Sequence, residues 1–148
     1  KEGVLCGILF ADLDACGQHA PLWTMRLLCA NYEDPRAAGV ASILTACYCW
    51  HLKTLGQPMG LLELGGGFDN IRAYCLYAKY GFLPAPHFRC KNMTNVVLMS
   101  DLHQLSFKNI LQGIQVKDPM CIPGPEQKEL IQKRTETYRL KTAKKPAI

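Results

Sequence analysis

Glycine and proline residues divide residues 34–82 into four segments, and this division constrains the fold more than any other feature of the sequence. A turn of small residues at 36–41 leads into an apolar pattern of helical period, which ends at Gly56 and Pro58. A short hydrophobic strand is expected over residues 59–64, before a run of three glycines. A second helical pattern covers residues 69–80 and closes at Gly81. We therefore expect turn, helix, strand and helix, with glycines where the backbone becomes left-handed or crowded.

The flanking segments extend this pattern into an α/β fold. Residues 3–10 form a continuous apolar run, which predicts a strand buried on both faces. Residues 11–21 contain aspartates, a glycine and a proline and are expected to form a loop. Another strand is expected over residues 22–31. Residues 87–91 and 95–100 flank a polar turn, which predicts a hairpin, and residues 83–86 are expected to be a connector.

Composition limits the class of protein and its compartment. The 148 residues are typical of one domain, and 49% hydrophobic against 20% charged residues indicate a globular chain. The sequence has no run of 18 apolar residues, so we expect no membrane span. Its eight cysteines are scattered and form no C-x-x-C pair, which favours buried thiols over disulfides or a metal site. We expect an intracellular, reducing compartment, either the cytoplasm or an organellar matrix. The start at Lys1, without Met, suggests a processed product or a fragment.

The C-terminal segment differs from the rest of the chain. We expect a domain over residues 1–102 and a basic, partly helical extension over residues 103–148. Of the net charge of +5, much lies in residues 125–148, where seven Lys or Arg face three Glu. Such a polar segment cannot offset the entropy of ordering by itself. We therefore expect it to order against an acidic partner, either protein or an RNA-containing assembly.

Two motifs within residues 34–82 resemble those of the GNAT superfamily of acyl-CoA-dependent N-acyltransferases. Residues 36–41 (RAAGVA) match the R/Q-x-x-G-x-G/A loop, and residues 70–82 (NIRAYCLYAKYGF) match N-x-x-A-x-x-L-Y-x-K-x-G-F. As in the family, one helix and one strand separate the two motifs. The resemblance covers residues 3–102 roughly, and it implies a mixed, mostly antiparallel sheet with a V-shaped splay beside the strand at 59–64.

The resemblance implies that the first motif binds the pyrophosphate of acetyl-CoA, or of another acyl-CoA, as co-substrate. Backbone N–H groups at a helix N-terminus suit an anion, and small side chains would let the phosphates reach them. The alternative is an ordinary turn that leads into a helix. The expected contacts come from Arg36, Ala37, Ala38, Gly39, Val40 and Ala41.

The second motif implies two further roles. Asn70 would contact the pantetheine arm, and Tyr77 would be the general acid that protonates the departing thiolate. A phenol can donate to a thiolate of similar basicity. The alternative for Tyr77 is a core aromatic, because apolar residues surround it in the sequence.

Glu63 is the candidate base that takes the proton of the amine acceptor. It lies inside the apolar strand at 59–64, and a carboxylate is rarely buried without a reason. The alternative is that Glu63 faces an open edge or pairs with an arginine such as Arg26. No metal is expected, and the acceptor amine is not identified by the sequence.

The N-terminal part of the family pattern, a strand, two helices and a strand, has no counterpart before residue 3. Two functions follow from the sequence. The first is transfer of an acetyl or similar acyl group from acyl-CoA to an amine. The second is a catalytically inactive subunit of the same fold, docked into a larger assembly through its basic tail.

Overall fold

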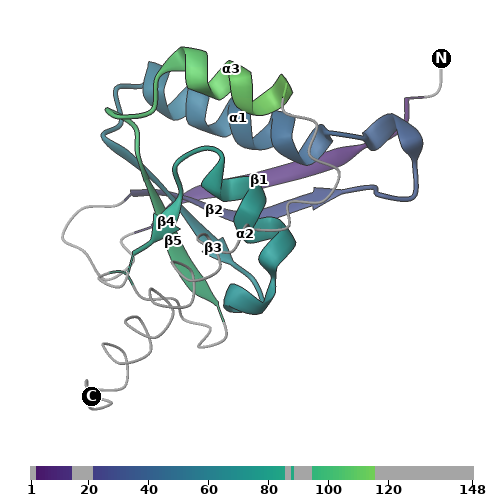
Figure 1. Ribbon diagram of the computed structural model, residues 1–148, viewed down its shortest axis with the longest axis horizontal. Helices are drawn as coiled ribbons and strands as arrows, with labels where there is room; N and C mark the ends of the chain where they lie inside the picture. Colours follow the sequence, from purple (N-terminus) through teal and green to yellow (C-terminus); the bar gives the residue numbers. More distant parts are fainter. Residues whose placement is uncertain (1–2, 15–21, 86–87, 89–94, 116–148) are drawn as a thin grey trace, which may run out of the picture.

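The computed structural model describes residues 3–14, 22–85, 88 and 95–115. Five strands form one sheet, three helices pack on it, and short 3-10 turns begin two of the connections (Figure 1). In chain order the elements are β1 (Gly7–Asp14), β2 (Leu22–Ala30), η1 (Pro35–Ala37), α1 (Val40–Thr54), β3 (Met59–Leu64), η2 (Gly67–Asp69), α2 (Ile71–Ala78), β4 (Leu83–Pro84), β5 (Val96–Asp101) and α3 (Phe107–Gln115).

The sheet is mixed and mostly antiparallel. Its strand order is β1-β2-β3-β5-β4, and β2 and β3 are the parallel pair, whereas the other neighbours are antiparallel. The predicted α/β class, with helices packed on such a sheet, is confirmed. The element order of residues 34–82 is also confirmed, and β3 has the predicted bounds.

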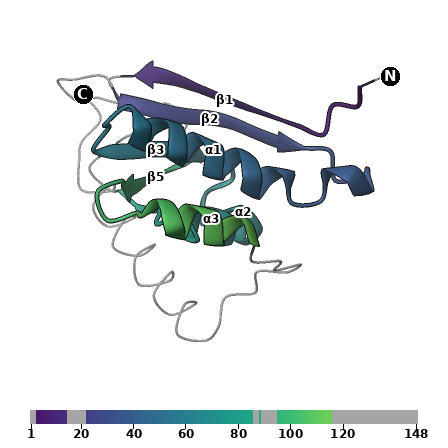
Figure 2. The ribbon, with the colours of Figure 1, turned by 90° about the horizontal axis from the view of Figure 1, so that it is seen from above.

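One face of the sheet carries the three helices and the main core (Figure 2). Side chains alternate along a strand, so Leu62 and Leu64 of β3 point toward the helices while Leu61 points away. Tyr48 and Leu52 of α1 belong to the same core cluster as Leu62 and Leu64. A smaller cluster on the other face contains Leu61, Val97, Ala85 and Phe88.

The first strand differs from its prediction. β1 begins at Gly7 and continues to Asp14, so it shares only residues 7–10 with the predicted strand and runs into the predicted loop at 11–21. It is an edge strand, and it is not buried on both faces: Ile8 is 49% exposed and Phe10 is 54% exposed. A continuous apolar run cannot distinguish a central strand from an edge strand, because both have the same local composition.

Helix α3 extends the folded body beyond Leu102. It runs antiparallel to α1: the Ser42 hydroxyl donates to the Gly113 carbonyl at 3.1 Å, while the rings of Trp50 and Phe107 are 4.4 Å apart. Ile110 is 1% exposed within the main core. Residues 103–115, which the sequence placed in the extension, therefore pack with the sheet. The predicted helix at 126–141 and the basic segment at 125–148 lie outside the described residues.

Only the second strand of the predicted hairpin lies within the described residues. Its second strand corresponds to β5, and its first, at residues 87–91, lies outside the described residues apart from Phe88. The described partner of β5 on that side is β4, which occupies part of the predicted connector. None of the described helices is long and apolar enough to cross a membrane.

Candidate functional site at the splayed strands

The parallel strands β2 and β3 separate soon after they meet. Two residue pairs are in register, Thr24 with Leu61 and Met25 with Leu62, although β2 continues to Ala30. The register between β1 and β2 shifts here, because Phe10 pairs with Leu27 and Ala11 with Met25. The shift leaves Arg26 as an extra residue in β2, and an irregularity of this kind increases local twist. The backbone of residues 26–30 consequently has an edge that β3 does not cover.

Two helix N-termini lie at the end toward which the strands separate. The chain leaves the carboxyl end of β2 and enters α1, and it leaves the carboxyl end of β3 and enters α2 (Figure 1). In open α/β sheets, ligands bind outside the carboxyl ends of parallel strands at such a point. The splay and the two helix entries therefore form the candidate site.

The loop at 34–41 folds around its own side chains. Asp34 caps the 3-10 turn by accepting from the Arg36 N–H at 2.9 Å, and its carboxylate holds the Arg36 guanidinium at 2.6 Å. The side-chain hydrogen bond with Arg36 lowers the pKa of Asp34, and the same bond raises the pKa of Arg36. Among the predicted donors, the N–H groups of residues 36–38 are thus used within the loop.

The backbone N–H groups that have no acceptor within the loop or the helix lie further along the chain, in the first turn of α1. Gly39 has φ of +80° and is the N-cap of α1, so Val40, Ala41 and Ser42 form the first turn. Their N–H groups have no intrahelical acceptor. Ala37 and Ala41 are buried and face the core, so packing explains why they are small. The exposed surface of the loop comes from Pro35, Arg36, Ala38 and Gly39.

Asn70 stabilises the N-terminus of α2. Its side-chain oxygen accepts from the Ala73 N–H at 3.3 Å, and its amide nitrogen donates to the Gly65 carbonyl at 3.1 Å. Asn70 is the N-cap of α2. Both ends of the amide are therefore engaged within the fold.

Tyr77 combines a buried ring with an accessible oxygen. The residue is 8% exposed, and its ring lies 6.3 Å from that of Phe82 in an edge arrangement. Within the described part of the chain, no fully buried side-chain oxygen lacks a hydrogen bond, and Tyr77 makes none, so its hydroxyl oxygen is not fully buried. Burial raises the pKa of Tyr77 to about 12, with smaller contributions from Tyr32 and Cys29. The phenol is thus protonated at neutral pH.

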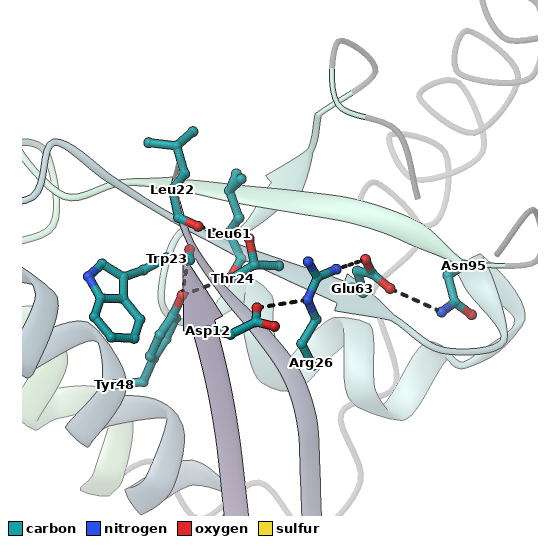
Figure 3. A network of polar contacts seen from close by, with 9 residues as sticks. All are labelled: Asp12, Leu22, Trp23, Thr24, Arg26, Tyr48, Leu61, Glu63 and Asn95. Carbon is teal, nitrogen blue, oxygen red and sulfur yellow. Dashed lines mark hydrogen bonds and ion pairs between the residues drawn. The ribbon is translucent and has the colours of Figure 1, made fainter. Parts of the chain in front are cut away.

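Glu63 is not a free carboxylate. It forms an ion pair with Arg26, and Arg26 also donates to Asp12 at 3.0 Å (Figure 3). Asn95 lies 3.5 Å from the second oxygen of Glu63. The predicted alternative, pairing with Arg26, is therefore confirmed. Asp12 is a second strand carboxylate that the sequence assigned to a loop, and the network joins β1, β2 and β3 where the splay begins.

Tyr48 fills the gap between the two strands from the side of α1. Its hydroxyl lies 2.9 Å from the carbonyl oxygens of both Trp23 and Leu61 (Figure 3). Burial raises the pKa of Tyr48 well above its ordinary value. The hydroxyl satisfies carbonyl groups that a longer parallel ladder would otherwise have paired.

The sequence did not single out the residues that meet across the open end of the splay. The Arg72 guanidinium of α2 lies 4.6 Å from the centre of the Tyr32 ring, which follows β2. Cys29 of β2 is exposed, contrary to the expectation of buried thiols, and Cys47 of α1 is exposed as well. An aromatic residue directly after a strand was the available signal for Tyr32. Among the described residues, no cluster of His, Cys, Asp or Glu could hold a metal ion.

Comparisons with known proteins do not assign the chain to a family. No family model matches it, and no curated protein matches its sequence. The solved structures that resemble it include the crystal structure of PH1933 from Pyrococcus horikoshii OT3, with 19% identity and a TM-score of 0.48. That alignment covers 65% of this chain and 57% of the other, so the chain spans less than two thirds of the length of this neighbour.

Proposed function

We propose that the chain is an acyl-CoA-dependent N-acyltransferase domain, which moves an acetyl or similar acyl group to an amine. The observation that carries this proposal is the edge of β2 at residues 26–30 that β3 does not cover, beside the first turn of α1. An extended pantetheine arm can add to an open strand edge, because its amides match the spacing of backbone partners. The two motifs that resemble the GNAT superfamily occupy this same site.

The pyrophosphate would bind at the first turn of α1. The N–H groups there and the positive end of the helix dipole favour an anion. The Arg36 guanidinium would join them by leaving the Asp34 carboxylate and binding a phosphate oxygen instead. The Arg36 side chain is 66% exposed, and Asp34 would keep its hydrogen bond from the Arg36 N–H, so this exchange leaves the cap of the turn in place.

The reaction joins the amine nitrogen to the acyl carbon and breaks the carbon–sulfur bond of the thioester. The nitrogen loses one proton to a base or to water, and the sulfur gains one from Tyr77. The Tyr77 phenol is protonated at neutral pH, as an acid requires, and its oxygen is not fully buried; burial raises its pKa to about 12, so its proton is harder to release than that of a free phenol. Glu63 would act as a base only after release from Arg26, so we assign the pair to holding the splayed strands together.

The alternative is a catalytically inactive domain of the same fold within a larger assembly, docked through its basic tail. Two observations favour it: the oxygen and the nitrogen of the Asn70 amide each make a hydrogen bond within the fold, and the Glu63 carboxylate is paired. Binding and turnover separate the two functions. An inactive domain with a retained site would bind acyl-CoA without transferring its acyl group to any amine in a panel.

Substitution of Ala38 tests the binding site without disturbing the fold. Ala38 is exposed and precedes the N-cap of α1, with φ of −57°. Ala38→Glu places a carboxylate near the helix N-terminus, which favours the helix and repels a phosphate. We expect its calorimetric Kd for CoA to rise by about tenfold or more. Ala38→Gln, the uncharged control, should bind as the wild type does.

Two further measurements complete the experiment: the affinity for pantetheine, and the stabilisation of the fold by acetyl-CoA. Pantetheine carries no phosphate, so its affinity should be the same for both variants. Acetyl-CoA at 100 times Kd should stabilise the wild type by about 2.7 kcal/mol. If the wild type does not bind CoA, or if both variants bind it equally, the loop is an ordinary turn and the proposal is wrong.

A further inference from the structure

Helices α1 and α3 expose apolar side chains along their shared outer surface, away from the splay. On α1, Ile43, Cys47 and Trp50 follow one another at helical spacing and are all exposed. On α3, Phe107, Leu111 and Ile114 do the same. These six residues are called the α1/α3 patch below.

The two rows are adjacent in space. The helices lie antiparallel and side by side (Figure 2), and the rings of Trp50 and Phe107 are 4.4 Å apart. Other faces of the same helices are already used: Ala46 and Ile110 are buried in the core, and Ser42 donates to Gly113 between the helices. The patch is therefore an additional apolar surface and not a misplaced part of the core.

Its exposure is large for side chains of these types. Trp50 is 42% exposed and Leu111 is 50% exposed, and both have exposed apolar neighbours. Isolated apolar residues on a surface are ordinary, but a contiguous group is typical of an interaction site. Tryptophan is also enriched among the residues that dominate binding energy at protein interfaces.

The charged side chains that α1 and α3 themselves carry are of one sign. Neither α1 nor α3 contains Asp or Glu, whereas they carry Lys53, Lys108 and the exposed His51. The Lys53 ammonium donates to the Leu102 carbonyl at 2.6 Å and lies 5.4 Å from the centre of the Phe107 ring. A positive charge is thus fixed at one end of the patch. The surface is complementary to apolar side chains flanked by carboxylates.

We propose that the α1/α3 patch docks an acidic amphipathic helix of another protein. Two antiparallel helices form a surface on which a third helix can pack with anchors at i, i+3, i+4 and i+7. Aspartate and glutamate beside those anchors would meet Lys53 and Lys108. This inference is independent of acyl transfer, because the patch lies on the outer surface of the helices.

Charge disfavours the other occupants. A second copy placed by twofold symmetry would bring its own lysines against these and supply no carboxylate from either helix. The tail at residues 125–148 is basic, so it would add positive charge. Membrane-binding helices carry clusters of four to eight Lys or Arg, as a typical range, and these two helices carry two lysines.

A peptide selection tests the proposal. The probe is a library of 18-residue amphipathic helices with fixed apolar anchors and random flanking positions. It is selected on the full chain and counter-selected on Leu111→Glu, which places a carboxylate in the patch. We expect the flanking positions to become enriched in Asp and Glu. Enrichment in Lys or Arg, or no enrichment over the counter-selected chain, would overturn the proposal.

The selected peptide is then measured against matched variants by calorimetry. We expect Leu111→Glu and Ile43→Glu each to raise its Kd by at least about tenfold. Leu55→Glu is the control, because Leu55 is 50% exposed and follows α1 outside the patch. Circular dichroism and melting temperature should show that all three variants are folded. An equal loss for Leu55→Glu would show that the peptide senses charge alone and would contradict the proposal.

Two further measurements distinguish the rejected occupants. Binding to phosphatidylserine vesicles that is lost in Leu111→Glu would assign the patch to a membrane surface. A dimer seen by light scattering and lost in the same variant would assign it to a second copy. We expect neither with the wild type, and either result would overturn the proposal of an acidic helix.

Discussion

Tyr77 shows how one residue can belong both to a core and to a candidate site. Its ring packs beside Phe82 in the main cluster, while its hydroxyl oxygen is not fully buried. Burial raises its pKa to about 12, so the phenol is protonated at neutral pH and is a weaker acid than a free phenol. The two predicted roles, core aromatic and general acid, are therefore compatible, and kinetics separate them.

Tyr77→Phe removes the hydroxyl group, which carries the transferable proton, and keeps the aromatic ring with its packing. With an amine acceptor, turnover should fall by about 10²-fold or more, while the affinity for acyl-CoA stays the same. The control is Tyr74→Phe, at another buried tyrosine of α2. Steady-state rates and calorimetry measure the two quantities. An unchanged rate in Tyr77→Phe would leave Tyr77 as a core aromatic only.

Arg26 has a larger predicted effect on stability than Glu63. Arg26→Met leaves the Asp12 and Glu63 carboxylates close together without the guanidinium that bridges them. Glu63→Gln leaves Arg26 with Asp12, so we expect a cost of about 1 kcal/mol, against about 3 kcal/mol for Arg26→Met. Urea unfolding measures both. Equal costs would mean that the network contributes through packing and not through charge.

At the scale of elements, α3 is held by contacts that leave no room for larger side chains. A Cβ atom at Gly113 would lie 2.7 Å from the Tyr80 ring, which is itself fully buried. The Tyr80 hydroxyl also lies 2.6 Å from that of Ser42, so the ring is fixed by a hydrogen bond. These contacts join α1, α3 and the end of α2 at one point.

Gly113→Ala should therefore destabilise the protein. Alanine favours a helix over glycine by about 1 kcal/mol, but forcing a methyl group into a packed core costs about 1–3 kcal/mol. Because the Tyr80 ring cannot move freely, we expect a net loss in the urea midpoint. Gln112→Ala, at an exposed position of α3, is the control and should change little. A gain in stability for Gly113→Ala would show that α3 can shift away from Tyr80.

At the scale of the whole molecule, the buried thiol of Cys49 and the buried phenol of Tyr77 predict a loss of stability at high pH. Burial raises the pKa of Cys49 from 9.0 to about 12 and that of Tyr77 from 10.0 to about 12. Above pH 9 the unfolded chain releases protons that the folded chain retains, so unfolding becomes more favourable. Their contribution to stability is complete below the unfolded pKa and is lost as pH rises toward 12.

Melting temperatures between pH 7 and pH 11 test this prediction. We expect the melting temperature to decline from near pH 9, where a free thiol begins to ionise. Cys49→Ala should weaken the first part of the decline, compared with its own value at pH 7. The exposed Cys47 provides the control, since Cys47→Ala should leave the pH dependence unchanged. A wild-type melting temperature that stays constant to pH 11 would contradict the assigned burial of these groups.

The sequence by itself determined the local order of residues 34–82. Gly39, Gly56 and Gly81 have positive φ at the predicted joints, and β3 has the predicted bounds. Turn residues and helical periodicity act over a few neighbouring residues, so they can be recognised without the fold. The same local reasoning identified the turn of small residues at 36–41.

Only the tertiary structure decided which of these residues are available for chemistry. Glu63 pairs with Arg26, 37 positions away in the sequence, and the splay arises where β2 and β3 lose register. Burial of α3 against α1 and exposure of β1 likewise depend on neighbours that are distant along the chain. The sequence offered the Glu63–Arg26 pair as one alternative among several, and only the packing of the elements chooses among such alternatives.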